Sequence, residues 1–105
     1  MDTQYDAIFV ALEFDRHLPK LDLHGVRPEE VESTIINFLV HQINKGQRAV
    51  QVIYGRGGMG VLKQKTIECL DKNKAEKTSG QKLLKAWKES VLDGAGGRCL
   101  VLLDG

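Results

Sequence analysis

Leu21-Asp22-Leu23-His24-Gly25 combines the alternation of a β-strand with two side chains that carry chemistry. Successive side chains of a strand point to opposite faces, so Leu21 and Leu23 enter a core while Asp22 and His24 share the other face. Gly25 follows where the chain must turn. An acid and an imidazole at one strand end can share a hydrogen bond and can both reach a ligand. An exposed polar face on a half-buried strand explains the same residues without a function.

The residues after Gly25 predict a helix that leads to a second, parallel strand. Pro28 followed by two glutamates is a typical helix start, and apolar residues recur at helical spacing until Lys45-Gly46. The β-branched run 48–54 predicts a buried strand. Strands joined by such a crossover run parallel. The end that carries Asp22 therefore lies at the same sheet edge as residues 54–60, where open α/β sheets bind ligands.

Tyr54-Gly55-Arg56-Gly57-Gly58-Met59-Gly60 stands between that strand and a predicted helix over about 61–72. Glycines let backbone amides approach a ligand, and a helix amino terminus adds free N–H groups and a positive dipole end. Arg56 can add a bidentate contact, so this turn is a candidate phosphate site. It lacks the Gly-Lys-Ser/Thr of a Walker loop and the spacing of the dinucleotide fingerprint. A purely structural strand-to-helix turn is the alternative.

An anion site beside Asp22 and His24 suggests a bound phosphodiester. Arg56 and the loop amides would hold the phosphate, His24 would move a proton, and Asp22 would orient or polarise it, so these three are the candidate catalytic residues. Asp22 could instead hold a divalent metal such as magnesium, but one carboxylate and one imidazole are too few to define a metal site. The candidate nucleic-acid-binding residues are Tyr54, Gly55, Arg56, Gly57, Gly58, Gly60, Lys63 and Arg98.

The remaining segments give weaker patterns. Residues 1–20 are interpreted as an N-terminal extension and a candidate lid, either strand or helix, with Phe14 docked against a domain that spans 21–105. The segment 83–90 suits a helical stripe or an edge strand. The apolar run 98–103 predicts a central strand.

Composition sets the class of protein. A chain of 105 residues is one domain, and its net charge of +1 creates no strong overall field for nucleic acid. Residues 1–44 hold 3 basic and 8 acidic residues (−5), whereas residues 45–105 hold 12 and 6 (+6). This asymmetry indicates either a basic face on the C-terminal half or scattered solvating lysines.

Targeting signals and cysteine spacing add two expectations. The longest early apolar run, 7–12, is too short to cross a membrane and follows acidic residues, so we expect a cytoplasmic protein without a membrane partner. Cys69 and Cys99 lack zinc-ligand spacing and are expected to be buried reduced thiols.

The motifs together resemble the Smr domain, the small MutS-related family, from Leu21 to about Leu103. The hallmarks are the LDLHG stretch, a glycine turn after the second strand, and a GGxG-type turn before an apolar last strand, found here at 94–103. The resemblance implies an α/β two-layer sandwich, a four-stranded mixed sheet with two helices in the order βαβαββ, in which 83–90 is a strand. Tyr54 stands where the family usually has His or Thr, and a phenol is a poor proton shuttle near neutral pH.

The resemblance also implies a function. Family members are nicking DNA endonucleases or RNA endonucleases, often fused to other domains, and Asp22, His24 and Gly55-Arg56-Gly57 match the proposed active-site and binding positions. We therefore predict a nucleic-acid-binding domain (RNA or DNA) with endonuclease activity, a phosphodiester hydrolase. The alternatives are a module that binds nucleic acid without cleaving it, and a protein-interaction module that uses residues 1–20 to contact a larger protein.

Overall fold

The computed structural model describes residues 4–55, 60–74, 83–90 and 97–104. Along these residues the elements are α1 (Asp6–Glu13), β1 (Lys20–Asp22), the 3-10 turn η1 (Pro28–Glu30), α2 (Val31–Asn44), β2 (Ala49–Ile53), α3 (Val61–Lys72), β3 (Leu84–Glu89) and β4 (Arg98–Leu103).

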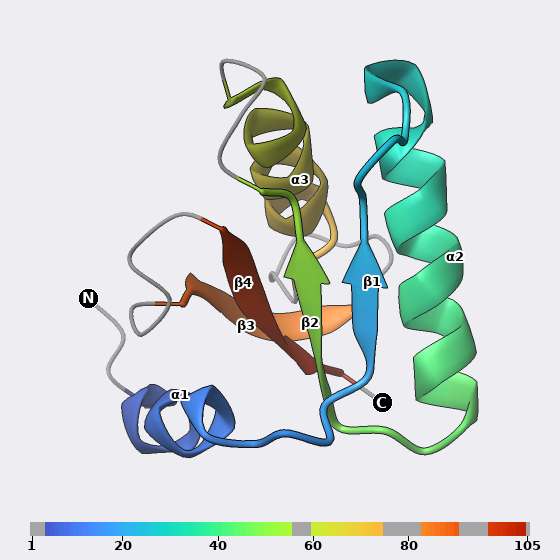
Figure 1. Cartoon of the computed structure of the whole chain (residues 1–105). Helices are drawn as coiled ribbons and strands as arrows, with labels where there is room; N and C mark the ends of the chain where they lie inside the picture. Colours follow the sequence, from blue (N-terminus) through green and yellow to red (C-terminus); the bar gives the residue numbers. More distant parts are fainter. Residues whose placement is uncertain (1–3, 56–59, 75–82, 91–96, 105) are drawn as a thin grey trace.

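The four strands form one mixed sheet in the order β1-β2-β4-β3 (Figure 1). β1 pairs parallel to β2, and β4 pairs antiparallel to both β2 and β3. This confirms the parallel strand pair and the central last strand. The carboxyl ends of β1, β2 and β3 therefore meet the amino end of β4 at one edge. We call this edge the rim; its described residues are 22–25, 54–55, 89–90 and 97–98.

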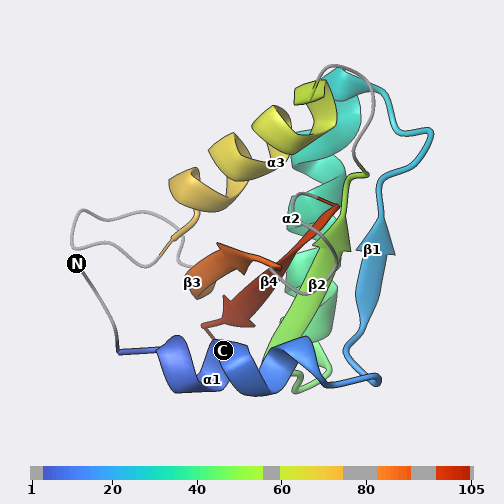
Figure 2. The ribbon, with the colours of Figure 1, turned by 60° about the vertical axis from the view of Figure 1, so that its left-hand side comes forward.

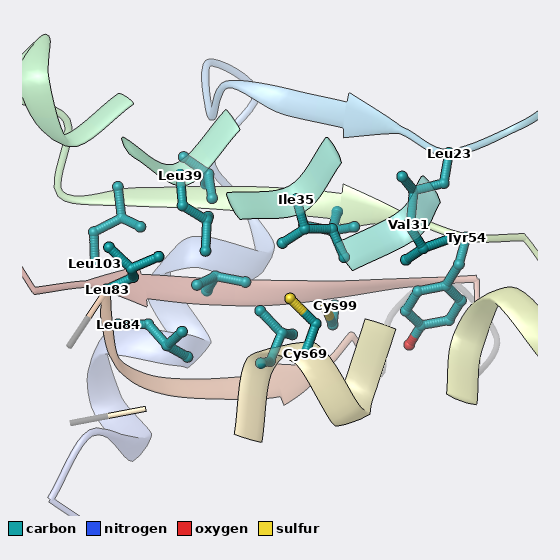
Figure 3. Packing of buried hydrophobic residues seen from close by; sticks show 14 residues of the cluster. Leu23, Val31, Ile35, Leu39, Tyr54, Cys69, Leu83, Leu84, Cys99 and Leu103 are labelled. Atoms are coloured by element: carbon teal, nitrogen blue, oxygen red, sulfur yellow. The ribbon is translucent and has the colours of Figure 1, made fainter. Parts of the chain in front are cut away.

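α2 and α3 cover one face of the sheet, with the main core between them and the strands (Figures 1 and 3). The helical stripe of α2 is fully buried at Val31, Ile35 and Leu39, because an apolar stripe of this period must be covered. Alternate residues of β2 face it, namely Val50 and Val52. The two-helix layer and the α/β class are thus confirmed.

α1 lies against the opposite face of the sheet, so a third layer covers part of it (Figure 2). Phe9 and Leu18 pack there on a second apolar cluster, whose other buried members are Ala49, Leu100 and Leu102. Of the two structures considered for this segment, the helix is the one observed. The docking predicted for Phe14 is wrong, because this side chain is 70% exposed. It follows Phe9 by five residues, about 140° around a helix, and faces away from the sheet.

The ambiguous segment 83–90 is a strand, β3, as the family resemblance implied. Trp87 fixes the strand to α3, because its indole N–H donates a hydrogen bond of 2.9 Å to Asp71. Both cysteines are free and buried, as predicted. Burial raises the pKa of Cys69 to about 11 and that of Cys99 to about 12, so both stay thiols at neutral pH.

Among the described residues, no helix is long and apolar enough to cross a bilayer.

Candidate functional site at the rim

Asp22 and His24 form a hydrogen-bonded turn at the end of β1. The Asp22 carboxylate accepts the backbone N–H of His24 at 2.9 Å, and the side chains of both residues are exposed. Between them Leu23 is fully buried, and its N–H donates to the Ile53 carbonyl at 2.8 Å. The predicted alternation is therefore present. The sequence allowed a hydrogen bond between the Asp22 carboxylate and the His24 imidazole. In the structure the carboxylate accepts from the His24 backbone amide and closes a local turn, as short acidic side chains do.

The start of the glycine loop is tied to the start of β4. The amides of Tyr54 and Gly55 both donate to the Gly97 carbonyl, at 3.1 and 3.0 Å. Gly55 has φ +76°, a conformation that favours glycine. Because its amide already has this partner, Gly55 offers a ligand its turn geometry and not a free N–H. The predicted site residues Arg56, Gly57 and Gly58 lie outside the described residues.

The described chain resumes at Gly60, which has φ +77° and caps the amino end of α3. No side-chain hydrogen bond caps this helix end in the described residues. Its first amides and the positive end of its dipole are groups that can bind an anion, and the phosphate site stays a prediction.

Tyr54 is a core residue, 5% exposed, at the end of the apolar cluster (Figure 3). Its hydroxyl donates to a Glu89 oxygen at 3.4 Å. Burial, followed by the nearby Cys99 and Glu89, raises the pKa of the Tyr54 phenol above its usual range. In this position the ring cannot stack on a base and the hydroxyl stays protonated near neutral pH. The side chain of Tyr54 therefore supports the rim from inside.

Lys63 brings a positive charge to the rim from the first turn of α3. Its ammonium pairs with the Glu89 carboxylate at 2.8 Å, and both side chains are more than a third exposed. The pair can open to admit a phosphate, because exposed ion pairs contribute little stability. Glu89 was not predicted. It lies in the segment 83–90, whose periodicity suits a helix or a strand. The sequence therefore did not indicate that this side chain reaches the rim.

Arg98 turns away from this group, towards α1. Its guanidinium donates to Gln51 Oε1 at 2.7 Å and lies 3.5 Å from Glu13 Oε1. The register pairs Asp22 with Ile53 and Ile53 with Arg98, so Asp22 and Arg98 share a sheet face. Two strand spacings separate them, about 10 Å. Glu13 and Gln51 carry no sequence pattern that could have indicated this contact.

A groove of about 640 Å³ lies at the other end of the sheet. It is lined by α1 residues such as Tyr5 and Ile8 and by Ile43, Arg48 and Leu103. None of the rim residues lines this groove, so it is not the pocket of the candidate site.

A metal site is not assigned. No cluster of three or more histidine, cysteine, aspartate or glutamate side chains occurs among the described residues in a geometry that could hold a metal ion. Asp22 and His24 supply only two such groups, so the magnesium alternative stays a prediction.

Comparison with known proteins agrees with this architecture. The chain aligns with the Smr domain of Thermus thermophilus MutS2 with a TM-score of 0.69 and 20% identity, over 84% of this chain and all of that one. It aligns with YdaL, a stand-alone small MutS-related protein from Escherichia coli, with a TM-score of 0.63 and 20% identity, over 82% of this chain and 64% of that one. No curated protein matches.

These structures establish the fold, and the family model adds the sequence evidence. The Smr domain model matches residues 21–104, which include β2, β3, β4, all of β1 except Lys20, and the helices α2 and α3. Since the match covers most of the chain and carries the same sheet, this protein belongs to the Smr domain family.

Proposed function

We propose that the protein binds single-stranded or unpaired nucleic acid across the rim and cleaves its phosphodiester backbone there. The observation that carries the proposal is that one sheet edge holds both an exposed acid–histidine turn and the connection to the amino terminus of α3, which no side chain of the described residues caps. The exposed side chains of Asp22 and His24 are accessible to a polymer. The basic excess of residues 45–105, +6, supplies attraction for phosphate.

In this proposal each group has one task. The first amides of α3, Lys63 and Arg56 hold a phosphate, and Arg56 does so from the turn between β2 and α3. His24 accepts the proton of the attacking oxygen as the new phosphorus–oxygen bond forms and the bond to the leaving oxygen breaks. Asp22 fixes the turn that carries His24, through the backbone hydrogen bond of 2.9 Å.

The test is His24→Ala, assayed on labelled single-stranded RNA and DNA, with magnesium and with EDTA. Loss of the proton-transfer group should slow cleavage about 100-fold or more. Affinity should hold, because His24 is not among the phosphate ligands. His41→Ala is the matched control, since His41 is also exposed but lies in the last turn of α2, far from the rim. Full cleavage by the His24→Ala protein contradicts the catalytic role.

Arg56→Ala separates binding from chemistry in the same assay. Removing a phosphate contact should weaken binding and cleavage together and reduce the salt dependence of binding by about one contact.

A second candidate is binding without cleavage, and Tyr54 favours it. The family usually has His or Thr at this position, and here the phenol is buried, bonded to Glu89 and held protonated. A protein that shifts a labelled strand with steep salt dependence and never shortens it, in any metal condition, supports this candidate over the nuclease.

A further inference from the structure

Four side chains from different parts of the chain form a polar cluster on the sheet face that α1 covers. The Ser90 hydroxyl donates to Glu13 Oε1 at 2.7 Å, and an Arg98 nitrogen lies 3.5 Å from the same oxygen. A second Arg98 nitrogen donates to Gln51 Oε1 at 2.7 Å. The side chain of Glu13 is 6% exposed and that of Arg98 is 14% exposed. The carboxylate is therefore enclosed between the helix that carries it and the sheet.

The contacts around this carboxylate are those of an oxyanion site. A hydroxyl and a guanidinium converge on one oxygen, and both groups bind phosphate as readily as carboxylate. Gln51, Ser90 and Arg98 lie on β2, just after β3 and on β4, whereas Glu13 alone among the four lies on α1. The three sheet residues lie outside α1, so they would stay together if α1 detached.

The cluster lies next to the proposed nucleic-acid surface. Arg98 and Ser90 both belong to the rim, and the Ser90 amide donates to the Arg98 carbonyl at 3.0 Å. Arg98 shares the sheet face and the cross-strand row of Asp22. A strand of nucleic acid that crosses the rim at Asp22 and continues along this row would reach Arg98 if α1 were absent.

We propose that Ser90 and Arg98 form a second phosphate-binding site, which the Glu13 carboxylate of the same chain occupies until α1 detaches. Tethering gives Glu13 a high effective concentration, so a free phosphate competes poorly while the helix is docked. The attachment of α1 is narrow: Phe9 is the buried residue of the helix, and the partly buried Leu12 packs on the same cluster. The oxyanion site stands on the contacts alone, and its use by nucleic acid rests on the proposed function.

The test measures binding of inorganic phosphate from the ¹⁵N amide signals of Ser90 and Arg98. Glu13→Gln removes the internal charge and keeps the shape, so phosphate should bind about tenfold more tightly, the effect of one charge-assisted contact. The gain should vanish in the double variant Glu13→Gln/Arg98→Gln. Phe9→Ala, which loosens α1 with Glu13 intact, should also strengthen phosphate binding.

Asp15→Asn is the matched control, because Asp15 is an exposed acid just beyond α1 whose carboxylate accepts the His17 amide. It should leave phosphate binding unchanged. If Glu13→Gln and Phe9→Ala both bind phosphate no better than the unaltered chain, the site is refuted. Hydrogen exchange of the α1 amides shows whether the helix has left in each variant; a helix that leaves without any gain in phosphate binding refutes the site as well.

Single-stranded RNA and DNA oligonucleotides separate this proposal from the previous one. When an oligonucleotide supplies the phosphate, Glu13→Gln should make the slope of log K against log salt concentration steeper by about 0.7. This is the value for one added phosphate contact on a single strand. A phosphate gain in variants that bind no oligonucleotide supports the oxyanion site and contradicts the proposed function. Oligonucleotide binding with no phosphate gain in Glu13→Gln supports the proposed function and contradicts the oxyanion site.

Discussion

Tyr54 illustrates how one residue can lie in a functional motif and act inside the core. It follows β2 directly, and its backbone amide helps to tie the glycine turn to Gly97. Its side chain packs among core residues and is bonded to Glu89, the partner of Lys63. The residue thus connects the core to a charged pair at the rim without reaching the surface.

Replacing Tyr54 by Phe separates the hydroxyl from the ring. The variant keeps the packing and loses one hydrogen bond, so the free energy of unfolding should fall by about 1 kcal/mol or less. Any cleavage rate should be unchanged, because the buried phenol does not exchange protons near neutral pH. Tyr54→Ala should cost about 3 kcal/mol or more through the cavity that it leaves. Urea denaturation and the oligonucleotide assay check both; a large loss of cleavage in Tyr54→Phe would contradict a purely supporting role.

The sequence predicted the local part of this site well. Alternation along residues 21–25 placed Leu23 inside and Asp22 and His24 outside, because strand periodicity is a property of neighbouring residues. The pairings of Arg98 with Glu13 and of Lys63 with Glu89 join residues far apart in the chain. They depend on which elements pack together, and no spacing in the sequence encodes that.

At the scale of elements, α1 is unusual because it turns a charged side chain towards the sheet and exposes apolar ones. Its last residue, Glu13, turns its carboxylate inward to Ser90 and Arg98. The outward face consists of exposed apolar side chains: Ala7, Val10, Ala11 and, at the carboxyl end, Phe14. Surface helices usually show the reverse arrangement. For this reason the hydropathy of the segment does not indicate which side of the helix is docked, and it wrongly predicts that Phe14 packs against the domain.

Two phenylalanines of this segment make a matched pair of variants. Phe9 is 4% exposed on the sheet, so Phe9→Ala should lower the free energy of unfolding by about 3 kcal/mol or detach α1 alone. Phe14→Ala removes an exposed ring and should change stability by less than about 0.5 kcal/mol. Urea denaturation and hydrogen exchange of the α1 amides measure both effects. Equal losses in the two variants would show that the docked side of the helix is not the one described.

For the whole molecule, the raised pKa values of two buried thiols and a buried phenol predict how the free energy of unfolding depends on pH. An unfolded thiol titrates near 9.0, whereas Cys99 in the fold has a pKa of about 12 because it is buried. Between these values the folded state keeps a proton that the unfolded state releases, so stability falls as pH rises. The raised pKa values of Cys69 and Tyr54 act in the same direction.

We therefore expect full stability below about pH 9 and a loss of about 1 kcal/mol per pH unit from Cys99 above it. Urea denaturation at pH 8, 9, 10 and 11 measures this slope. Cys99→Ala lowers stability at every pH but should flatten the slope. An unaltered chain with equal stability at pH 8 and pH 11 would contradict the argument.

The overall architecture could be predicted because its patterns are strong and local. The stripe of α2 and the apolar run of β4 each predict one element, and the helical crossover from β1 to β2 indicates a parallel pair. The segment 83–90 was different. Its apolar residues fit the spacing of a strand and of a helix equally well. Pairing with β4 makes it a strand.

The position of β4 in the sheet has a consequence for synthesis on the ribosome. Among the described strands it comes last in the sequence, yet it separates β2 from β3. Until Arg98–Leu103 emerges, one side of β2 has no neighbour to hydrogen-bond with, and β3 has only the bridge from Leu84 to Lys74. Such open strand edges invite other chains. A nascent polypeptide stalled before this point would leave these edges open and would be prone to aggregate.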